Sequence, residues 1–433
     1  MVSDKIDQTV PAPSFGEALA TWGRIGILSF GGPTAQIALM HRIIVDEKRW
    51  LGEQHYLSAL SFCMLLPGPE AMQLATYVGW RMHGLKGGMA AGLLFVLPGA
   101  LIVLALSIIY AAFGNVPLVT AIFLGIKAAV LVIVIEALLR VAKRALARRE
   151  HWVIAALSFV AIFFFGAPFP LLVFAAALWG YVTTRRDEDT KRYTGARVSI
   201  AQTGKTIAVG LAVWFAPLLL IASLFGREHI LTQLSIFFSK LAIVTFGGAY
   251  AVLAYMGQDV VTRFGWLDAG AMLDGLGLAE TTPGPLILVT EFVGYLSAYR
   301  AATDAPILMG LLGAFVALWA TFVPCFLWIF AGAPYLHWIT AQPRLRGALS
   351  AITAAVVGVI LNLAVWFALH VMFTAVSQID YGPLRLWLPD LASIDWRVPA
   401  LAALSGYLLL WRHWNIPAVL AIAAASAVLL TSL

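Results

Sequence analysis

The amino-acid sequence predicts an all-α polytopic membrane protein with two inverted homologous halves that contain broken or re-entrant helices. Three observations predict this fold class. Of the 433 residues, 61% are hydrophobic and 12% are charged, whereas ordinary soluble domains carry roughly 25% charged residues. Nine apolar segments are separated by short connections, many of them basic. The chain also matches itself when it is shifted by 216 residues.

Five apolar segments are long enough to cross a hydrocarbon core about 30 Å thick, namely 87–113, 116–139, 206–225, 306–331 and 347–372. Four shorter segments are expected to cross as short helices, namely 152–166, 168–183, 398–411 and 414–432. Pro168 and Pro170 mark the turn between the first two of these. Residues 1–15 have no apolar core, so we expect the membrane segments themselves to direct insertion.

Basic residues predict which side each connection faces. One cluster precedes the hairpin 152–183 and a second cluster follows it, and an excess of Lys and Arg is typical of cytoplasmic loops. We therefore expect a cytoplasmic N-terminus and a periplasmic C-terminus. The predicted organisation is a cytoplasmic tail (1–14), a first membrane repeat (15–184), a cytoplasmic basic linker (185–205), a connecting transmembrane helix (206–229) and a second, inverted repeat (230–433).

The internal repeat rests on motifs that keep the same spacing in both halves. The shift superposes Phe30-Gly-Gly32 on Phe246-Gly-Gly248, Trp50 on Trp266, and Pro67-Gly-Pro69 on Pro283-Gly-Pro285. If 206–225 is an unpaired connecting helix, an odd number of crossings separates equivalent points, and the repeats are inverted. Inverted repeats in membrane proteins are typical of secondary transporters with alternating access, although some channels share this symmetry.

The same motifs interrupt the segments 15–50 and 56–83 near their middles. Glycine frees the backbone and proline removes a donor, so the helix is expected to break at each motif. Pro33 and Pro69 are expected to begin new half-helices, since proline is favoured at the first helical position. A half-helix that starts inside the membrane presents unpaired N–H groups and a positive dipole end to an anion. Packing kinks with small residues are the alternative. The segments either cross or return, which gives thirteen crossings, or nine crossings with four re-entrant pieces.

Charged residues at membrane depth are candidate functional residues. Arg24 and Lys240 occupy equivalent positions of the two repeats, each six residues before its Phe-Gly-Gly motif. Both halves have therefore retained a cation at this position. Snorkelling of these cations to the interface is the alternative. The acids, in contrast, have no acidic equivalent in the other half. Glu70, Glu280 and Glu291 are candidates for coupling transport to a second ion. Lys127 is a further candidate, although it could instead pair with Glu136. For Glu70, capping of the helix is an equally good explanation.

The expected substrate-binding residues combine these cations with the breaks and the polar side chains beside them. Ser29 and Thr245 would add hydroxyl donors, and Gln36, Gln73 and Thr282 would add neutral hydrogen bonds, although helix–helix contacts explain them equally well. The full set is Arg24, Ser29, Gly31, Gly32, Pro33, Gln36, Gly68, Pro69, Glu70, Gln73, Lys240, Thr245, Gly247, Gly248, Thr282 and Gly284.

Other function classes have little support in the sequence. Scattered histidines and the apolar surroundings of Cys63 and Cys325 give no metal site or disulfide. No catalytic or nucleotide-binding signature is present, so we expect neither an enzyme nor a cofactor nor ATP-driven pumping. The net charge of +6 is a topology signal and gives no reason to expect a nucleic-acid partner.

Two runs of residues make the sequence familiar. Ser29-Phe-Gly-Gly-Pro33 and Leu65-Leu-Pro-Gly-Pro-Glu-Ala-Met-Gln-Leu-Ala-Thr-Tyr-Val-Gly79, with their counterparts Thr245-Phe-Gly-Gly248 and Ala279-Glu-Thr-Thr-Pro-Gly-Pro285, resemble the long-chain, two-domain type of the chromate ion transporter family. The resemblance covers the chain from about Phe15. It implies export of chromate from the cytoplasm across the bacterial inner membrane, and with it chromate resistance.

The residues themselves indicate only an anion. Sulfate has nearly the size and charge of chromate, so a sulfate or general oxyanion carrier is the first alternative, and an anion channel is the second. An inside-negative potential would favour the outward movement of a dianion, and antiport against a proton or sulfate is compatible with this. The expected partners are chromate or sulfate as substrate and the lipid bilayer, with a homodimer as the common assembly of such transporters.

Overall fold

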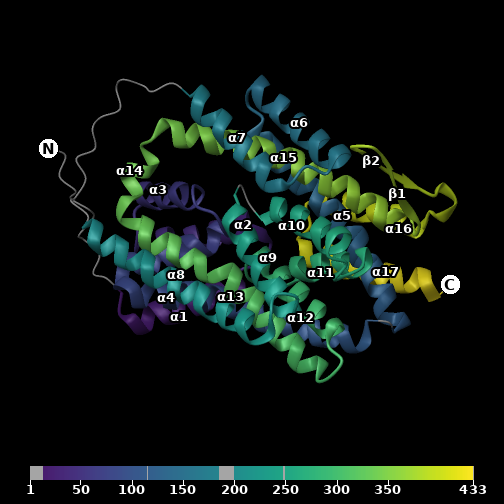
Figure 1. The fold of residues 1–433 in the computed structure, drawn as a ribbon, viewed down its shortest axis with the longest axis horizontal. Coiled ribbons are helices and arrows are strands. Elements are labelled where there is room, and N and C mark those ends of the chain that lie inside the picture. Colours follow the sequence, from purple (N-terminus) through teal and green to yellow (C-terminus); the bar gives the residue numbers. More distant parts are fainter. Residues whose placement is uncertain (1–12, 115, 185–198, 247–248, 433) are drawn as a thin grey trace.

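The computed structural model describes residues 13–114, 116–184, 199–246 and 249–432. Its helices run mainly along the long axis of the molecule, with the start of the first helix and the end of the last helix toward opposite ends of that axis (Figure 1). We call these the N end, where the first helix begins, and the C end, where the last helix stops. Five helices are long and apolar enough to cross a membrane.

The first half contains seven helices and one π-helical segment among the described residues. In chain order they are α1 (Phe15–Leu28), α2 (Gly32–His41), η1 (Arg42–Glu47, π-helical), α3 (Glu53–Cys63), α4 (Glu70–Phe113), α5 (Pro117–Ala145), α6 (Arg149–Phe165) and α7 (Phe169–Thr183). Helix α4 is kinked at His83 and Gly84, where the backbone angles are not helical. We call residues 70–82 its short arm and residues 85–113 its long arm.

The second half repeats this order. After α8 (Ile200–Phe225) come α9 (Ile230–Val244), α10 (Ala249–Gln258), η2 (Asp259–Arg263, π-helical), α11 (Ala269–Thr281), η3 (Leu286–Leu288), α12 (Val289–Ala301), α13 (Pro306–Gly332), η4 (Ala333–Tyr335), α14 (Leu336–Thr340), α15 (Pro343–Met372), β1 (Val376–Tyr381), β2 (Leu384–Pro389), η5 (Leu391–Ser393), α16 (Arg397–Gly406), η6 (Tyr407–Trp411, π-helical) and α17 (Ile416–Ser432). Helices α9 to α12 match α1 to the short arm of α4, and even the two π-helical segments coincide.

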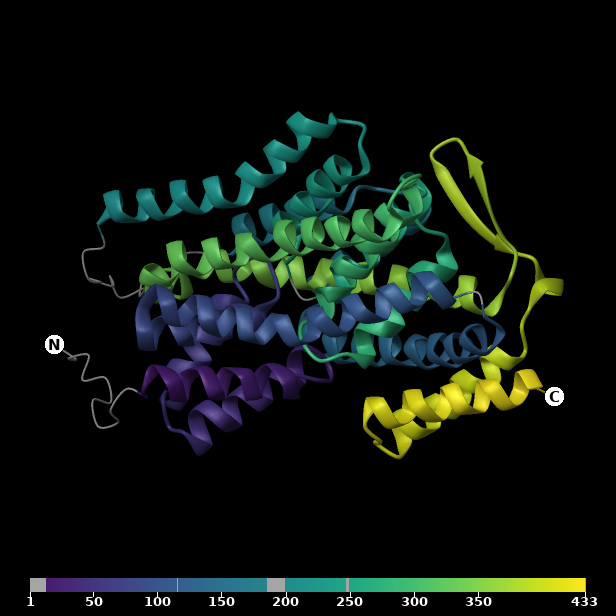
Figure 2. The same ribbon diagram turned by 90° about the horizontal axis from the view of Figure 1, so that it is seen from below.

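Helix α8 has no counterpart in the first half. It lies at the periphery of the molecule (Figure 2) and contacts α9 and α13. It begins at Ile200, six residues before the predicted start, so residues 200–205 belong to the helix and not to the linker. Residues 185–198 lie outside the described part of the chain.

The interrupted segments are re-entrant, and their two ends meet on the same side. Lys48, just after η1, contacts Glu17 of α1 at 2.8 Å, and Arg300 of α12 contacts Asp268 at the start of α11 at 2.9 Å. Both contacts join the first helix of a hairpin to the end of its second helix. The described residues therefore form re-entrant hairpins, as in one of the two topologies that the sequence allows.

The four hairpins are defined by the elements on either side of each break. Hairpin 1 is α1–α2, hairpin 2 is α3 with the short arm of α4, hairpin 3 is α9–α10, and hairpin 4 is α11–α12. Their described tip residues are 29–31, 64–69, 245–246 and 282–285, which we call tips 1 to 4. Hairpins 1 and 2 enter from the N end, and hairpins 3 and 4 enter from the C end (Figures 1 and 2).

The inversion of the two halves is visible in their equivalent long helices. Gly88 faces the ring of Phe330, and Gly92, one turn later in α4, faces Phe326, one turn earlier in α13. The long arm of α4 and helix α13 therefore pack antiparallel. Pro98 and Pro324 are equivalent residues inside these helices, so antiparallel packing means that the repeats have opposite orientations.

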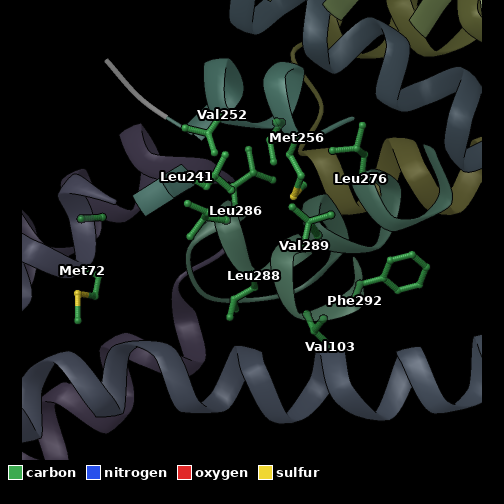
Figure 3. Packing of buried hydrophobic residues seen from close by; sticks show 14 of the residues in the cluster. Met72, Val103, Leu241, Val252, Met256, Leu276, Leu286, Leu288, Val289 and Phe292 are labelled. Atoms are coloured by element: carbon green, nitrogen blue, oxygen red, sulfur yellow. The ribbon is translucent and has the colours of Figure 1, made fainter. Parts of the chain in front are cut away.

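The terminal helix pairs are exchanged between the halves. Helices α6 and α7 pack on α15 of the second half, whereas α16 and α17 pack on α5 of the first half. One apolar core thus joins both halves. Figure 3 shows part of it, in which Val103 of α4 lies near Leu288, Val289 and Phe292 of hairpin 4. The buried side chains of this cluster come from both halves, so the halves form one body.

A β-hairpin between α15 and α16 is the one element type that the predicted fold class does not contain. Strands β1 and β2 pair antiparallel, with Val376 opposite Pro389, and the two-residue turn holds Gly382 at φ +61°. The first half has only residues 146–148 at the equivalent place. The hairpin is therefore an addition to the second half at the C end.

Candidate functional site

The four tips meet near the middle of the molecule, and two crossed hydrogen bonds join them. The N–H of Gly68 in tip 2 donates to the carbonyl of Thr245 in tip 3 at 2.8 Å, and the N–H of Gly284 in tip 4 donates to the carbonyl of Ser29 in tip 1 at 2.8 Å. Gly68 is the repeat equivalent of Gly284, and Ser29 of Thr245. Each half therefore donates to the other through the same pair of residues.

These crossed bonds depend on glycine. Gly68 has φ +124° and Gly284 has φ +91°, values that favour glycine because other residues lack this freedom. A Cβ on Gly68 would lie 2.8 Å from Sγ of Cys325, and Gly284 lies against Gly99. Gly99 and Cys325 each follow the equivalent prolines of α4 and α13. Each long helix thus supports the tip of the opposite half.

Two glutamines brace the breaks. The Nε2 atom of Gln36 donates to the carbonyl oxygens of Gly284 at 2.6 Å and Ser29 at 3.2 Å, so it bridges tips 1 and 4. The Nε2 atom of Gln73 donates to the carbonyl of Pro67 at 2.7 Å. In this conformation both amides make the helix–helix contacts that the sequence left as the alternative to binding an oxyanion.

The hydroxyl groups beside the breaks also bond locally. Ser29 donates to the carbonyl of Ile25 at 2.6 Å, and its equivalent Thr245 donates to Leu241 at 2.5 Å. Thr282 donates to Ala279 at 3.3 Å. These bonds satisfy carbonyls at the ends of the incoming helices. The hydroxyls are thus engaged within their own hairpins.

The breaks of hairpins 1 and 2 each start a helix that leads away from the centre, but neither Pro33 nor Pro69 is its first residue. Gly31, with φ +85°, is the residue before α2, and Pro33 is the second residue of that helix, not the first. Pro69 is the cap that precedes the short arm of α4, and Glu70 follows in its first turn. The positive ends of these helix dipoles therefore converge on the tips. Gly247 and Gly248 lie outside the described residues.

The tips of the two halves differ in exposure. In hairpin 1, Phe30 is 40% exposed and Thr34 and Ala35 of α2 are also exposed, and Met64 of tip 2 is 53% exposed. Residues 282–285 of tip 4 are buried. Within the described chain, the first-turn N–H groups of α2 have no hydrogen-bond partner outside their own helix. Tip 1 therefore presents accessible donors, whereas tip 4 does not.

The two symmetric cations lie beside the tips rather than between them. The guanidinium of Arg24 is 55% exposed and lies 3.6 Å from Glu47 of η1. Lys240 lines a cavity of about 730 Å³ at the C end, together with Asp259 and Arg263. Arg24 and Lys240 thus face opposite ends of the molecule, as the inverted repeat requires.

Two acids near the tips of the second half have different surroundings. Glu280 accepts a hydrogen bond from Tyr250 of α10 at 3.0 Å. Oε2 of the buried Glu291 has no hydrogen-bond partner among the described residues. These two carboxyl groups therefore differ in how firmly the surrounding residues hold them.

Lys127 pairs with Asp274 of α11 at 3.1 Å, and Tyr110 donates to the same carboxylate at 2.8 Å. Pairing of Lys127 with Glu136 is wrong, because Glu136 pairs with Arg140 one turn away. Neither Asp274 nor Tyr110 could be assigned to Lys127 from the sequence, since 147 residues separate the lysine from the aspartate. The one usable signal was that Asp274 is an acid at membrane depth whose repeat equivalent, Ser58, is uncharged.

Comparison with known proteins matches each half to the same family. The sequence pattern of the chromate transporter family matches residues 16–181 and 232–429, which leaves out the linker and α8. A chromate transport protein of Pseudomonas aeruginosa is 33% identical over 369 residues, covering 83% of this chain and 82% of the relative.

Two further relatives agree. A chromate transport protein of Cupriavidus metallidurans is 30% identical and covers 83% of this chain and 84% of its own length. A probable chromate transport protein of Synechococcus elongatus is 30% identical, with 84% and 87% covered. No solved structure matches the chain. Two inverted halves with converging tips, each matching the same family pattern, lead to one conclusion: the chain belongs to the chromate transporter family.

Proposed function

We propose that this protein exports chromate from the cytoplasm across the bacterial inner membrane as a secondary transporter, and thereby confers chromate resistance. The observation that carries the proposal is the convergence of helix N-termini from two inverted halves on one central region. Such ends bind oxyanions through backbone N–H groups and the helix dipole. The substrate-binding residues are those of the four tips, with Arg24 and Lys240 attracting the anion from either end.

The crossed bonds suit a transport cycle. A hydrogen bond between backbone groups contributes about 0.5–1.5 kcal/mol net, so either bond can open and close during turnover. Opening one of them frees the N–H of Gly68 or Gly284 for the anion. Alternating access then consists of opening one crossed bond while the other stays closed.

The charge distribution supports a cytoplasmic N end. The kink of α4 and the helix ends and connections there carry an excess of Lys and Arg, including Lys86, Arg148, Arg149, Arg344 and Arg346, as is typical of the cytoplasmic side. The exposed tips 1 and 2 then open to the cytoplasm, and the buried tip 4 closes the outer side. An inside-negative potential favours outward movement of the anion by about 2.3 kcal/mol per charge per 100 mV.

Chromate flux into inside-out proteoliposomes is the direct test. With an imposed potential, inside-positive in these vesicles, we expect saturable chromate uptake that excess sulfate does not abolish. Strong inhibition by sulfate would indicate a general oxyanion carrier. Conductance without saturation would indicate a channel. The absence of chromate flux in folded protein would contradict the proposal.

Among the coupling candidates Glu70, Lys127, Glu280 and Glu291, we expect Glu291 to carry the exchanged proton. Glu280 is held by Tyr250 and Lys127 by Asp274, whereas Oε2 of Glu291 is free to receive a proton. Glu291→Gln should therefore make chromate flux independent of an imposed pH gradient. The measurement is chromate flux at fixed membrane potential, with and without the pH gradient. Asp304→Asn is the control, because it neutralises an exposed acid just after α12. Unchanged gradient dependence in Glu291→Gln would exclude this role.

A further inference from the structure

A cavity of about 730 Å³ opens at the C end, outside the four tips. Its walls come from four places: α9, the segment α10–η2, the turn between α6 and α7, and the β-hairpin. Three cations line it, namely Lys240, Arg263 and Arg385, against one acid, Asp259. Gln233, Gln378 and Thr262 add neutral polar groups. The charged lining therefore has a net charge of +2.

The cations are only partly compensated by acids, because Asp380 lies opposite Arg385 in the register of the β-hairpin without forming an ion pair with it. Arg263 contacts Asp259 at 3.5 Å, but its side chain is 66% exposed. Neither Lys240 nor Arg385 forms an ion pair with a described residue. The guanidinium of Arg385 packs against Gly166, whose φ of +58° ends α6 and leaves no side chain in the way. Arg385 is thus held over the cavity by the backbone of the first half.

The equivalent residues at the N end have a different charge balance. Lys240 corresponds to Arg24, Arg263 to Glu47, Gln233 to Glu17 and Thr262 to Asp46. In hairpin 1 the cations are paired with acids, Arg24 with Glu47 and Lys48 with Glu17. The β-hairpin that supplies Arg385 has no counterpart there. The cations of this cavity are therefore less balanced by acids than their equivalents in hairpin 1.

We propose that this outer cavity is a second oxyanion-binding site, which takes a sulfate-like or phosphate-like group through Lys240, Arg263 and Arg385. Guanidinium and ammonium groups that converge on one space suit a tetrahedral anion with several acceptor oxygens. Under the proposed function, on which this role rests, the site is where the exported anion leaves or an external anion enters. The positive field concentrates anions at the opening.

The test reads occupancy of the cavity without transport. Gln378→Cys puts a thiol at the cavity wall, and the native Cys63 and Cys325 are buried. In nanodiscs of zwitterionic lipid, an anionic methanethiosulfonate reagent should label this thiol faster than a cationic one. Millimolar sulfate should slow that labelling about tenfold, because sulfate bound to the cations of the cavity keeps the anionic reagent away from the thiol. Leu391→Cys, exposed at the same end, should be labelled at a rate that sulfate does not change.

Charge variants assign the effect to the cavity. Adding Lys240→Gln with Arg385→Gln should remove both the preference for the anionic reagent and the protection by sulfate. Arg227→Gln, an exposed cation at the same end but outside the cavity, should leave both intact. Protein that labels normally but carries no chromate would refute the proposed function and leave this site standing.

A second arm distinguishes the source of the oxyanion. Nanodiscs of anionic phospholipid without sulfate would protect the thiol if a lipid headgroup occupies the cavity, and would leave it reactive if the ligand is a free anion. Labelling that responds to neither sulfate nor anionic lipid would overturn the proposal. Protection that persists in the doubly neutralised protein would overturn it as well.

Discussion

Replacing Gly68 or Gly284 by alanine is expected to lower chromate flux at least about tenfold, the rate effect of roughly 1.4 kcal/mol. Each glycine has a positive φ, at +124° and +91°, where a residue with a Cβ is strained by about 1–3 kcal/mol. Each also donates one of the crossed hydrogen bonds that join the halves. Alanine would therefore displace the N–H group on which both the contact and the proposed anion site depend.

The steric surroundings make the two positions differ. A Cβ on Gly68 would lie 2.7 Å from Nε2 of Gln73 and 2.8 Å from Sγ of Cys325, whereas a Cβ on Gly284 would lie 3.0 Å from Cδ1 of Leu288. We therefore expect the larger defect in Gly68→Ala. Cys325→Gly, which gives α13 the residue found at the equivalent position of α4, should partly restore Gly68→Ala by removing one of these contacts.

Initial rates of chromate uptake, normalised to folded protein in the membrane, measure the effect. Gly204→Ala is the matched control, because Gly204 lies inside α8 with no atom within 4 Å of an added Cβ. That change should leave flux unchanged and stabilise the helix by about 0.5–1 kcal/mol. Native flux in both Gly68→Ala and Gly284→Ala would contradict a role of the crossed bonds in transport.

The sequence was sufficient for the fold class, the repeat and the positions of the breaks. The breaks could be predicted because Pro67-Gly-Pro69 and its counterpart act locally: they remove donors and free the backbone wherever they stand. The repeat was detectable because its motifs keep the same spacing in both halves. The predicted spanning segments agree with the helices to within six residues at each end, except that 87–113 corresponds to the long arm of α4 alone. All of these are properties of neighbouring residues or of fixed offsets.

The partners of the candidate site residues could not be predicted in this way. A helix of fourteen residues followed by Gly-Gly-Pro can continue or return, and only contacts such as Lys48 with Glu17 decide between the two. The acceptors of Gly68 and Gly284 lie in the other half of the chain. The β-hairpin had a usable signal, the alternating residues of 376–389 around Gly382-Pro383, but apolar length alone did not detect it.

Neutralising Lys127 alone should destabilise the protein strongly, whereas neutralising Lys127 and Asp274 together should not. The ammonium lies 3.1 Å from the carboxylate, and their side chains are 20% and 8% exposed. Removing one member of a buried pair leaves an uncompensated charge and costs about 3–5 kcal/mol, while replacing both members by neutral groups is often harmless. Lys127→Met should therefore lower the yield and melting temperature of the folded protein, and Lys127→Met with Asp274→Asn should restore both.

The double variant also separates stability from transport. Asp274 holds α11 of hairpin 4 to α5 through Lys127 and to α4 through Tyr110, whereas the equivalents of Asp274 and Lys127, which are Ser58 of α3 and Thr353 of α15, cannot form an ion pair. The Lys127–Asp274 pair thus locks hairpin 4 to α5, and no equivalent ion pair holds hairpin 2 to α15. If this lock opens during the transport cycle, the double variant will be folded but its chromate flux will differ from that of the native protein. Tyr110→Phe, which removes one hydrogen bond from an uncharged donor, will change the flux in the same direction but by less. A double variant with native stability and native flux would show that the pair stabilises the helix packing and has no role in transport. A Lys127→Met protein as stable as the native one would show that the Asp274 carboxylate does not need the lysine, and would contradict the assignment of the lock to this pair.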